Sequence, residues 1–132
     1  MNSKKPTIWI IDSEQWPRAC LRAELIERGY DAVGFVRAGQ ALSAILSGRS
    51  STPGAIVLEL RGQAIKGNVL DLLGATNIPL VLLGGSVEVN DPAAQNLKAA
   101  VILKRPITLG EIVDALQGVV SREPHARGAR SR

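Results

Sequence analysis

The sequence is poor in the side chains that most catalytic and metal-binding sites use. Its 132 residues include one cysteine, Cys20, and one histidine, His125. A single cysteine excludes an internal disulfide and a cysteine-built zinc site. A lone histidine near the C-terminus leaves Ser-His-Asp, Cys-His and multi-histidine metal sites unavailable within the fold. No nucleophile–base pair is visible either, so we do not expect an enzyme.

Aromatic residues are also scarce, at 3% of the chain: Trp9, Trp16, Tyr30 and Phe35. The chain has too few aromatic side chains to form a surface that stacks nucleic-acid bases. Its core must be built from Leu, Ile, Val and Ala. We expect Trp9 in the core. Trp16 opens a helical pattern and is a candidate for a partly exposed partner contact.

Long apolar runs are missing as well. No stretch reaches the length of a membrane span, and the N-terminus, Met-Asn-Ser-Lys-Lys-Pro, does not resemble a signal peptide. The expected location is the cytoplasm, with no membrane partner.

The basic charge, +4 with a pI near 9.7, is confined to the ends. Residues 121–132 contain four arginines and one acid, whereas residues 7–120 contain ten basic and eleven acidic residues. We therefore predict a domain over residues 1–122 and a basic, disordered tail over residues 123–132. Nucleic acid is not the expected partner; an accessory protein that binds it through this tail is one alternative.

Short β-branched runs alternate with helical patterns along the chain. Strands are expected at residues 7–12, 31–35, 55–59, 79–83 and 101–103. Helices are expected at residues 13–28, 39–47, 68–76 and 91–100, and from residue 108 onward. In the first helix Leu21, Leu25 and Ile26 share a face, and in the last Leu109, Ile112, Val113 and Leu116 do. The alternation predicts an α/β fold, a doubly wound five-stranded parallel sheet of the (βα)5 type.

In such a sheet the functional crevice lies at the carboxyl ends of the strands. Asp12, Glu59 and Gly84 all occupy strand ends, and no glycine-rich phosphate loop follows the first strand. Gly84-Gly85-Ser86 reads as a strand-to-loop turn, with an anion-binding nest as the alternative.

From about Thr7 to about Val120, the sequence resembles the receiver domain of response regulators (CheY-like). The resemblance rests on Asp12, Gly29-Tyr30, Glu59, Gly67, Pro79 and Lys104-Arg105-Pro106. It implies a flavodoxin-like fold with strand order 2-1-3-4-5 and a role in two-component, or phosphorelay, signal transduction.

Several positions depart from a working receiver, which needs clustered carboxylates, Mg²⁺ and hydroxyl donors. Ser13 stands where the second acid of the pocket is usual. Glu59 replaces the phosphoacceptor aspartate, and Gly84 replaces the usual Thr or Ser hydroxyl.

Two further departures follow on the last strand. Arg105 directly precedes the proline, so the usual lysine is either replaced or displaced to Lys104. Ile102 stands where a switching aromatic residue is common. Together these changes indicate that phosphotransfer is lost.

We therefore expect a pseudo-receiver, an atypical receiver domain that acts as a phosphorylation-independent interaction module. An active Mg²⁺-dependent phosphoacceptor with a degenerate site is the alternative. The expected partner is a protein, such as a histidine kinase or an effector, and residues 91–120 are the expected face, including for a homodimer.

Glu59 has two interpretations: a partial, fixed mimic of the phosphorylated state, or a carboxylate paired with Lys104 or Arg105. No cofactor or metal is expected. A weakly held Mg²⁺ at Asp12, Glu14 and Glu59 is the alternative to a plain polar pair at the end of the first strand.

Overall fold

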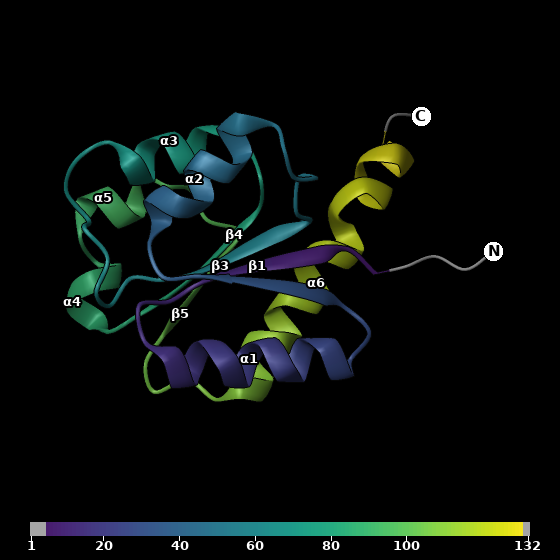
Figure 1. The fold of residues 1–132 in the computed structure, drawn as a ribbon, viewed down its shortest axis with the longest axis horizontal. Helices are drawn as coiled ribbons and strands as arrows, with labels where there is room; N and C mark the ends of the chain where they lie inside the picture. The colour runs from purple at the N-terminus through teal and green to yellow at the C-terminus, as the bar shows by residue number, and fades with distance from the viewer. Residues whose placement is uncertain (1–4, 131–132) are drawn as a thin grey trace.

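A five-stranded parallel sheet crosses the centre of the molecule in the order β2-β1-β3-β4-β5 (Figure 1). The structure is a computed structural model that describes the backbone of residues 5–130 and the side chains of residues 5–121. The strands are β1 (Thr7–Ile11), β2 (Asp31–Phe35), β3 (Ala55–Glu59), β4 (Leu80–Gly84) and β5 (Val101–Lys104). The predicted fold class and strand order are confirmed.

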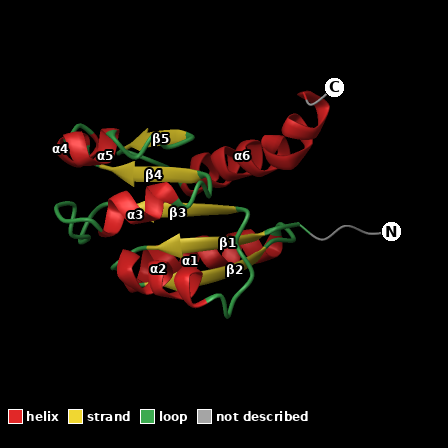
Figure 2. Ribbon diagram, turned by 90° about the horizontal axis from the view of Figure 1, so that it is seen from above, coloured by secondary structure: helices red, strands yellow, loops and turns green. Residues whose placement is uncertain are grey.

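Helices cover both faces of this sheet, as Figures 1 and 2 show. The helices are α1 (Gln15–Glu27), α2 (Ala38–Ser47), α3 (Val69–Ala75), α4 (Ser86–Val89), α5 (Pro92–Gln95) and α6 (Leu109–Arg130). Helices α1 and α6 lie on one face, and α2, α3 and α5 lie on the other. None of the helices described is long and apolar enough to cross a membrane.

Each face of the sheet has its own apolar core, because successive strand residues point to opposite sides. In β1, Ile8 and Ile10 pack with α1 and α6, whereas Trp9 and Ile11 pack with α2 and α3. Every residue of β3 and β4 is buried, as expected of central parallel strands. Trp9 is 3% exposed and belongs to the core, as predicted, whereas Trp16 is 77% exposed.

The helix predicted over residues 91–100 is wrong in extent. Asp91 does start a helix, because its Oδ1 accepts a hydrogen bond from the Ala93 N–H at 2.9 Å. However, α5 ends at Gln95, and Lys98 turns the chain with a φ of 54°. The chain must turn here because Ala100 N–H already donates to Leu80 O at 2.9 Å as β5 joins β4.

The short helix α4 was not expected, since the sequence predicted only a turn after Gly84. Its first turn is capped by Glu88, whose Oε1 accepts from the Gly85 N–H at 2.7 Å. Val89 then enters the core on the α2–α3 side.

The last helix begins at the predicted capping box, in which Thr108 N–H donates to Glu111 Oε1 and Glu111 N–H donates to Thr108 Oγ1. Val113 and Leu116 are fully buried, as predicted. The prediction was wrong for Leu109, which is 37% exposed; it lies in the first turn of α6 and lines a cavity beside α1. Ile26, at 44% exposed, also lies outside the predicted buried face.

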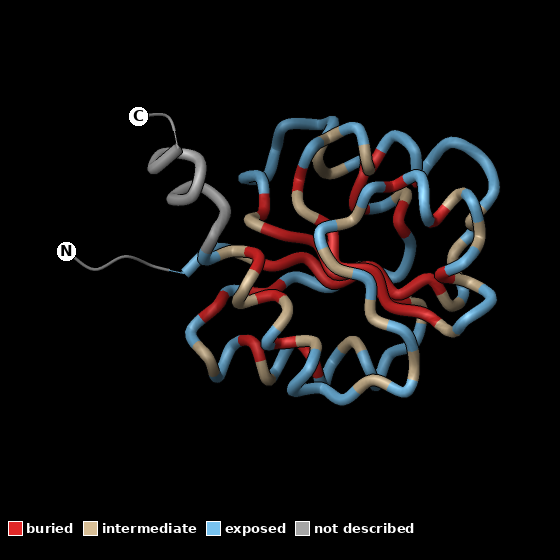
Figure 3. Tube along the Cα trace, turned by 180° about the vertical axis from the view of Figure 1, so that it is seen from behind, coloured by how far each residue is buried: buried red, intermediate tan, exposed pale blue. Residues whose placement is uncertain are grey.

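Figure 3 shows how burial concentrates in the strands and in the inner faces of the helices. The backbone of α6 is assigned as far as Arg130. The side chains from residue 122 onward lie outside the described residues, so the domain boundary at residue 122 and the disordered tail over residues 123–132 remain predictions.

Candidate functional site

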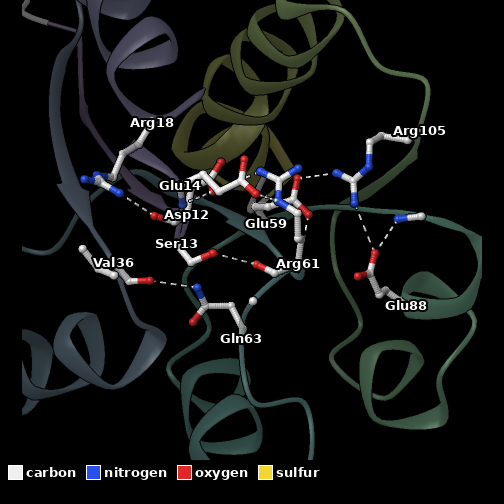
Figure 4. Close-up of polar contacts among 12 residues, drawn as sticks. Asp12, Ser13, Glu14, Arg18, Val36, Glu59, Arg61, Gln63, Glu88 and Arg105 are labelled. Atoms are coloured by element: carbon white, nitrogen blue, oxygen red, sulfur yellow. Dashed lines mark hydrogen bonds and ion pairs between the residues drawn. The ribbon is translucent and has the colours of Figure 1, made fainter. Parts of the chain in front are cut away.

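Two buried carboxylates meet at the carboxyl edge of the sheet (Figure 4). Asp12 directly follows β1, and Glu59 is the last residue of β3; they are 5% and 4% exposed. Because β1 and β3 are hydrogen-bonded neighbours, their ends place both acids in one crevice, as predicted. Burial of two charges requires nearby partners.

Arg105 is the partner of Glu59. Its Nη1 donates to Glu59 Oε1 at 2.6 Å, and its Nη2 donates to Glu88 Oε1 at 3.2 Å. The hydrogen bond that Arg105 donates to Glu59, with the nearby charges of Glu59, Glu88 and Asp12, raises the pKa of Arg105 against the opposing effect of its burial. Arg105 therefore stays cationic and spans two acids at once, which a single ammonium group does poorly.

A second arginine, Arg61, contacts the other acids of the crevice. Its Nη2 donates to Asp12 Oδ1 at 3.2 Å. Its Nε lies 3.1 Å from Glu14 Oε2, close enough for an ion pair but without the geometry of a hydrogen bond. The Arg61 backbone N–H donates to Glu59 Oε2 at 2.9 Å. Arg61 thus joins three acids.

Sequence reasoning missed Arg61. The available signal was its position: a basic residue two places after a strand-end acid, in a chain whose folded part is almost charge-balanced. Such a residue remains at the same edge of the sheet as the acid and can turn back towards it.

Ser13 packs against the loop that carries Arg61. Its Oγ donates to the Arg61 carbonyl at 3.2 Å. Gly62 follows with a φ of 78°, and a Cβ built on it would overlap Ser13 Oγ. The small side chain at position 13 and the missing side chain at position 62 therefore depend on each other.

The same loop is tied to the start of α2. Arg37 Nη1 donates to the Gly62 carbonyl at 2.8 Å. The Gln63 side chain accepts from Ala38 N–H and donates to Val36 O, both at 2.9 Å. These bonds satisfy a first-turn donor of α2 and fix the loop after β3 in place.

The remaining predicted positions lie farther from the acids or carry no functional group. Gly84 ends β4, and a Cβ there would come within 3.2 Å of Val89 and 3.3 Å of Glu88, so a larger side chain needs a local shift. Lys104 is exposed and forms no ion pair within the part of the chain described. Ile102, at the switch-aromatic position, is 39% exposed on the edge strand β5.

The crevice as it stands does not fit Mg²⁺. This ion takes oxygen ligands in near-octahedral geometry. Two of the oxygens that Mg²⁺ would need, on Asp12 and Glu59, instead accept hydrogen bonds from arginines. Among the residues that the structure describes, no group of three His, Cys, Asp or Glu side chains is placed to hold a metal.

No protein-family model matches the sequence, and comparison with curated proteins gives no match. Solved structures do match. NtrX from Brucella abortus, in complex with ATP, aligns with a TM-score of 0.76 and 18% identity over 96% of this chain and 29% of NtrX.

Isolated receiver domains align over nearly their whole length. The beryllofluoride-activated NtrC receiver domain gives a TM-score of 0.72 and 19% identity, over 92% of this chain and 98% of that one. A response regulator receiver protein from Pseudomonas putida gives 0.73 and 21%, over 89% and 99%. The chain thus has the flavodoxin-like fold of response regulator receiver domains. It spans less than a third of NtrX.

Proposed function

We propose that this chain is an atypical receiver domain that acts in two-component signalling as a protein-interaction module, without being phosphorylated and without enzymatic activity. The observation that carries the proposal is the hydrogen bond from Arg105 to Glu59, at the position where the resemblance puts the phosphoacceptor. The fold shared with receiver domains supports the signalling role.

Phosphoryl transfer to a carboxylate requires a free oxygen that can attack in line, with cations placed around the phosphoryl group. Here Glu59 Oε1 accepts from Arg105, and Glu59 Oε2 accepts from the Arg61 N–H. Attack by either oxygen would first break a charge-assisted or backbone hydrogen bond inside a buried crevice. The crevice also fits no Mg²⁺, so the charge on an incoming phosphoryl group would lack its usual neutralisation.

Glu59 is better described as a paired carboxylate than as a free mimic of an acyl phosphate. Of the two cations that the sequence offered, Arg105 is in contact and Lys104 is not. The pairing neutralises the charge that a mimic would present.

The test is incubation of the purified protein with Mg²⁺ and acetyl phosphate, followed by intact-mass measurement. We expect no phosphoryl adduct, whereas the NtrC receiver domain run in parallel serves as the positive control. Glu59→Gln is the matched variant, since it keeps the side-chain shape and removes the nucleophile. A stoichiometric adduct on the wild type that disappears in Glu59→Gln would establish the alternative, an active receiver with a degenerate site.

The proposed partner surface is the face formed by residues 91–120. It carries the outer side of the edge strand β5, with Ile102 39% exposed, and the first turn of α6, with Leu109 37% exposed. Exposed apolar side chains at a sheet edge are commonly part of protein–protein interfaces. The partner is a histidine kinase, an effector or a second copy of the chain.

Light scattering during gel filtration distinguishes the homodimer from the hetero-partner arrangement. A dimer that becomes a monomer in Ile102→Glu, but not in Leu46→Glu on α2, locates self-association on this face. Leu46 is a suitable control because it is 73% exposed on α2, a helix that lies outside residues 91–120 and contacts β1 and β2.

A further inference from the structure

A second hollow lies at the amino edge of the sheet, away from the carboxylate crevice. It is a surface cavity of about 420 Å³ between the C-terminal end of α3, the start of β4 and the segment that links α5 to β5. Its volume falls within the range of small-molecule sites. None of the acids or arginines of the crevice lines it.

The floor of this cavity is apolar. Ile78, Leu80 and Leu97 line it and are 8%, 3% and 6% exposed. Gly74 on α3 allows Leu97 to pack closely, since a Cβ on Gly74 would lie 3.1 Å from Leu97 Cδ2. Such a floor suits an aliphatic group of a ligand.

The rim of the cavity carries one charge of each sign. Asp71 comes from α3 and Lys98 from the segment after α5. Neither forms an ion pair with any residue in the described part of the chain. Asn77 and Asn96 add two carboxamides to the lining. The rim can therefore accept an ammonium group at Asp71 and a carboxylate at Lys98, with amide N–H groups available to the same carboxylate.

Two left-handed residues turn the backbone beside this cavity. Within residues 5–130, the non-glycine residues with positive φ are Asn77, at 65°, and Lys98, at 54°, and both line this cavity. Asn tolerates the left-handed region, but Lys adopts it at a cost. Each of these residues follows a helix end, since the Asn77 N–H donates to Gly74 O at 3.3 Å and the Lys98 N–H donates to Gln95 O at 3.4 Å, so the two turns shape the cavity.

We propose that this cavity binds a small zwitterion with an aliphatic side chain, which is the chemistry of a free α-amino acid. The ammonium group pairs with Asp71, the carboxylate pairs with Lys98, and the side chain covers Ile78, Leu80 and Leu97. The proposal does not depend on the carboxylate crevice, because no residue lines both sites. Four of the cavity residues, Asn96, Leu97, Lys98 and Ala100, do fall within the partner face proposed above.

The experiment uses L-leucine as the probe, with binding followed by two-dimensional amide NMR of the full chain. We expect saturable shifts at Gly74, Asn77 and Lys98, and none at Glu59 or Arg61. Leucinamide lacks the carboxylate and 4-methylpentanoate lacks the ammonium group. Each should bind about tenfold or more weakly, the loss expected for one charge-assisted contact.

Matched variants test the two charges separately. Asp71→Asn and Lys98→Gln should each weaken L-leucine binding by about tenfold, whereas the exposed controls Asp114→Asn and Lys66→Gln should leave it unchanged. Thermal melts confirm that all four variants remain folded. The proposal is overturned if L-leucine produces no saturable shifts, if both analogues bind as well as L-leucine, or if the Asp71 and Lys98 variants bind like their controls.

Discussion

Arg105 Nη1 lies 2.6 Å from Glu59 Oε1, and this contact joins the ends of two strands that are not neighbours in the sheet. Glu59 ends β3, Arg105 follows β5, and β4 lies between them. The same guanidinium also contacts Glu88, in the short helix α4. One side chain therefore connects three segments of the carboxyl edge.

Removal of this arginine should destabilise the fold. In Arg105→Met the buried carboxylate of Glu59 keeps only the Arg61 N–H as a donor, because its ion-pair partner is gone. Leaving a buried charge unpaired is costly, although the partial exposure of Arg105 moderates the loss. We expect the free energy of unfolding, measured by urea denaturation, to fall by about 2 kcal/mol.

The double variant Glu59→Gln/Arg105→Met supplies the control for this experiment. It removes both charges, so it should recover more than half of the lost stability. Equal stability of Arg105→Met and the wild type would show that the contact does not hold the fold together.

Arg61 should be what keeps divalent cations out of the crevice. Arg61→Ala frees Asp12 Oδ1 and the Glu14 carboxylate from their cation, leaving oxygen ligands of the kind that Mg²⁺ and Mn²⁺ prefer. We expect Mn²⁺ affinity, measured by calorimetry, to rise by about tenfold or more over the wild type.

Arg37→Ala is the matched control, since Arg37 contacts the same loop through the Gly62 carbonyl but touches no carboxylate of the crevice. Its Mn²⁺ affinity should equal that of the wild type. If the Mn²⁺ affinity of Arg61→Ala also matched that of the wild type, Arg61 would not be what excludes divalent cations from the crevice.

The strands could be predicted because each of their signals is local, whereas the strand order came from the resemblance to receiver domains. Buried strands such as β3 read as continuous apolar runs between turn residues, and the end of a strand fixes where its last side chain lies. For this reason Asp12 and Glu59 were placed together correctly. The capping box at Thr108 and Glu111 was equally local and was also correct.

The partners of the acids were harder to predict because they depend on how loops turn. Local sequence left Lys104 and Arg105 equivalent as cations, and only the path of the chain after β5 selects Arg105. Arg61 turns back into the crevice because its loop is fastened by Ser13 and Gln63, contacts that join distant parts of the sequence. The early end of the helix predicted over residues 91–100 has the same origin, since β4 fixes where Ala100 must lie.

Two glycines, Gly62 in the loop after β3 and Gly48 at the end of α2, separate the effect of backbone strain from that of steric overlap. Gly62 and Gly48 have similar φ values of 78° and 68°, but a Cβ on Gly62 would overlap Ser13, whereas a Cβ on Gly48 meets nothing within 4 Å. Gly48→Ala should therefore lower the free energy of unfolding by about 1 kcal/mol, the cost of a left-handed non-glycine residue.

Gly62→Ala should cost clearly more, about 2–3 kcal/mol, because Ser13 or the loop must also move. Urea denaturation of both variants measures the difference. Equal losses of unfolding free energy in the two variants would mean that Ser13 moves aside at no cost and that the loop is not packed tightly against it.

The single tyrosine should make the protein less stable at high pH. Burial raises the pKa of Tyr30 above its ordinary value of 10.0, and the nearby charge of Arg28 lowers it by a smaller amount. The folded state therefore resists losing the phenolic proton that the unfolded chain releases at about pH 10. The contribution of Tyr30 to the free energy of unfolding is fully present below that pH, and it is lost as the pH rises through the folded-state pKa.

An absorbance titration of tyrosinate should give a midpoint above 10.0 in the folded protein and near that value in urea. Between about pH 9 and about pH 11, the free energy of unfolding should fall more in the wild type than in Tyr30→Phe. Parallel losses in the two proteins would assign the alkaline instability to the lysines and arginines instead.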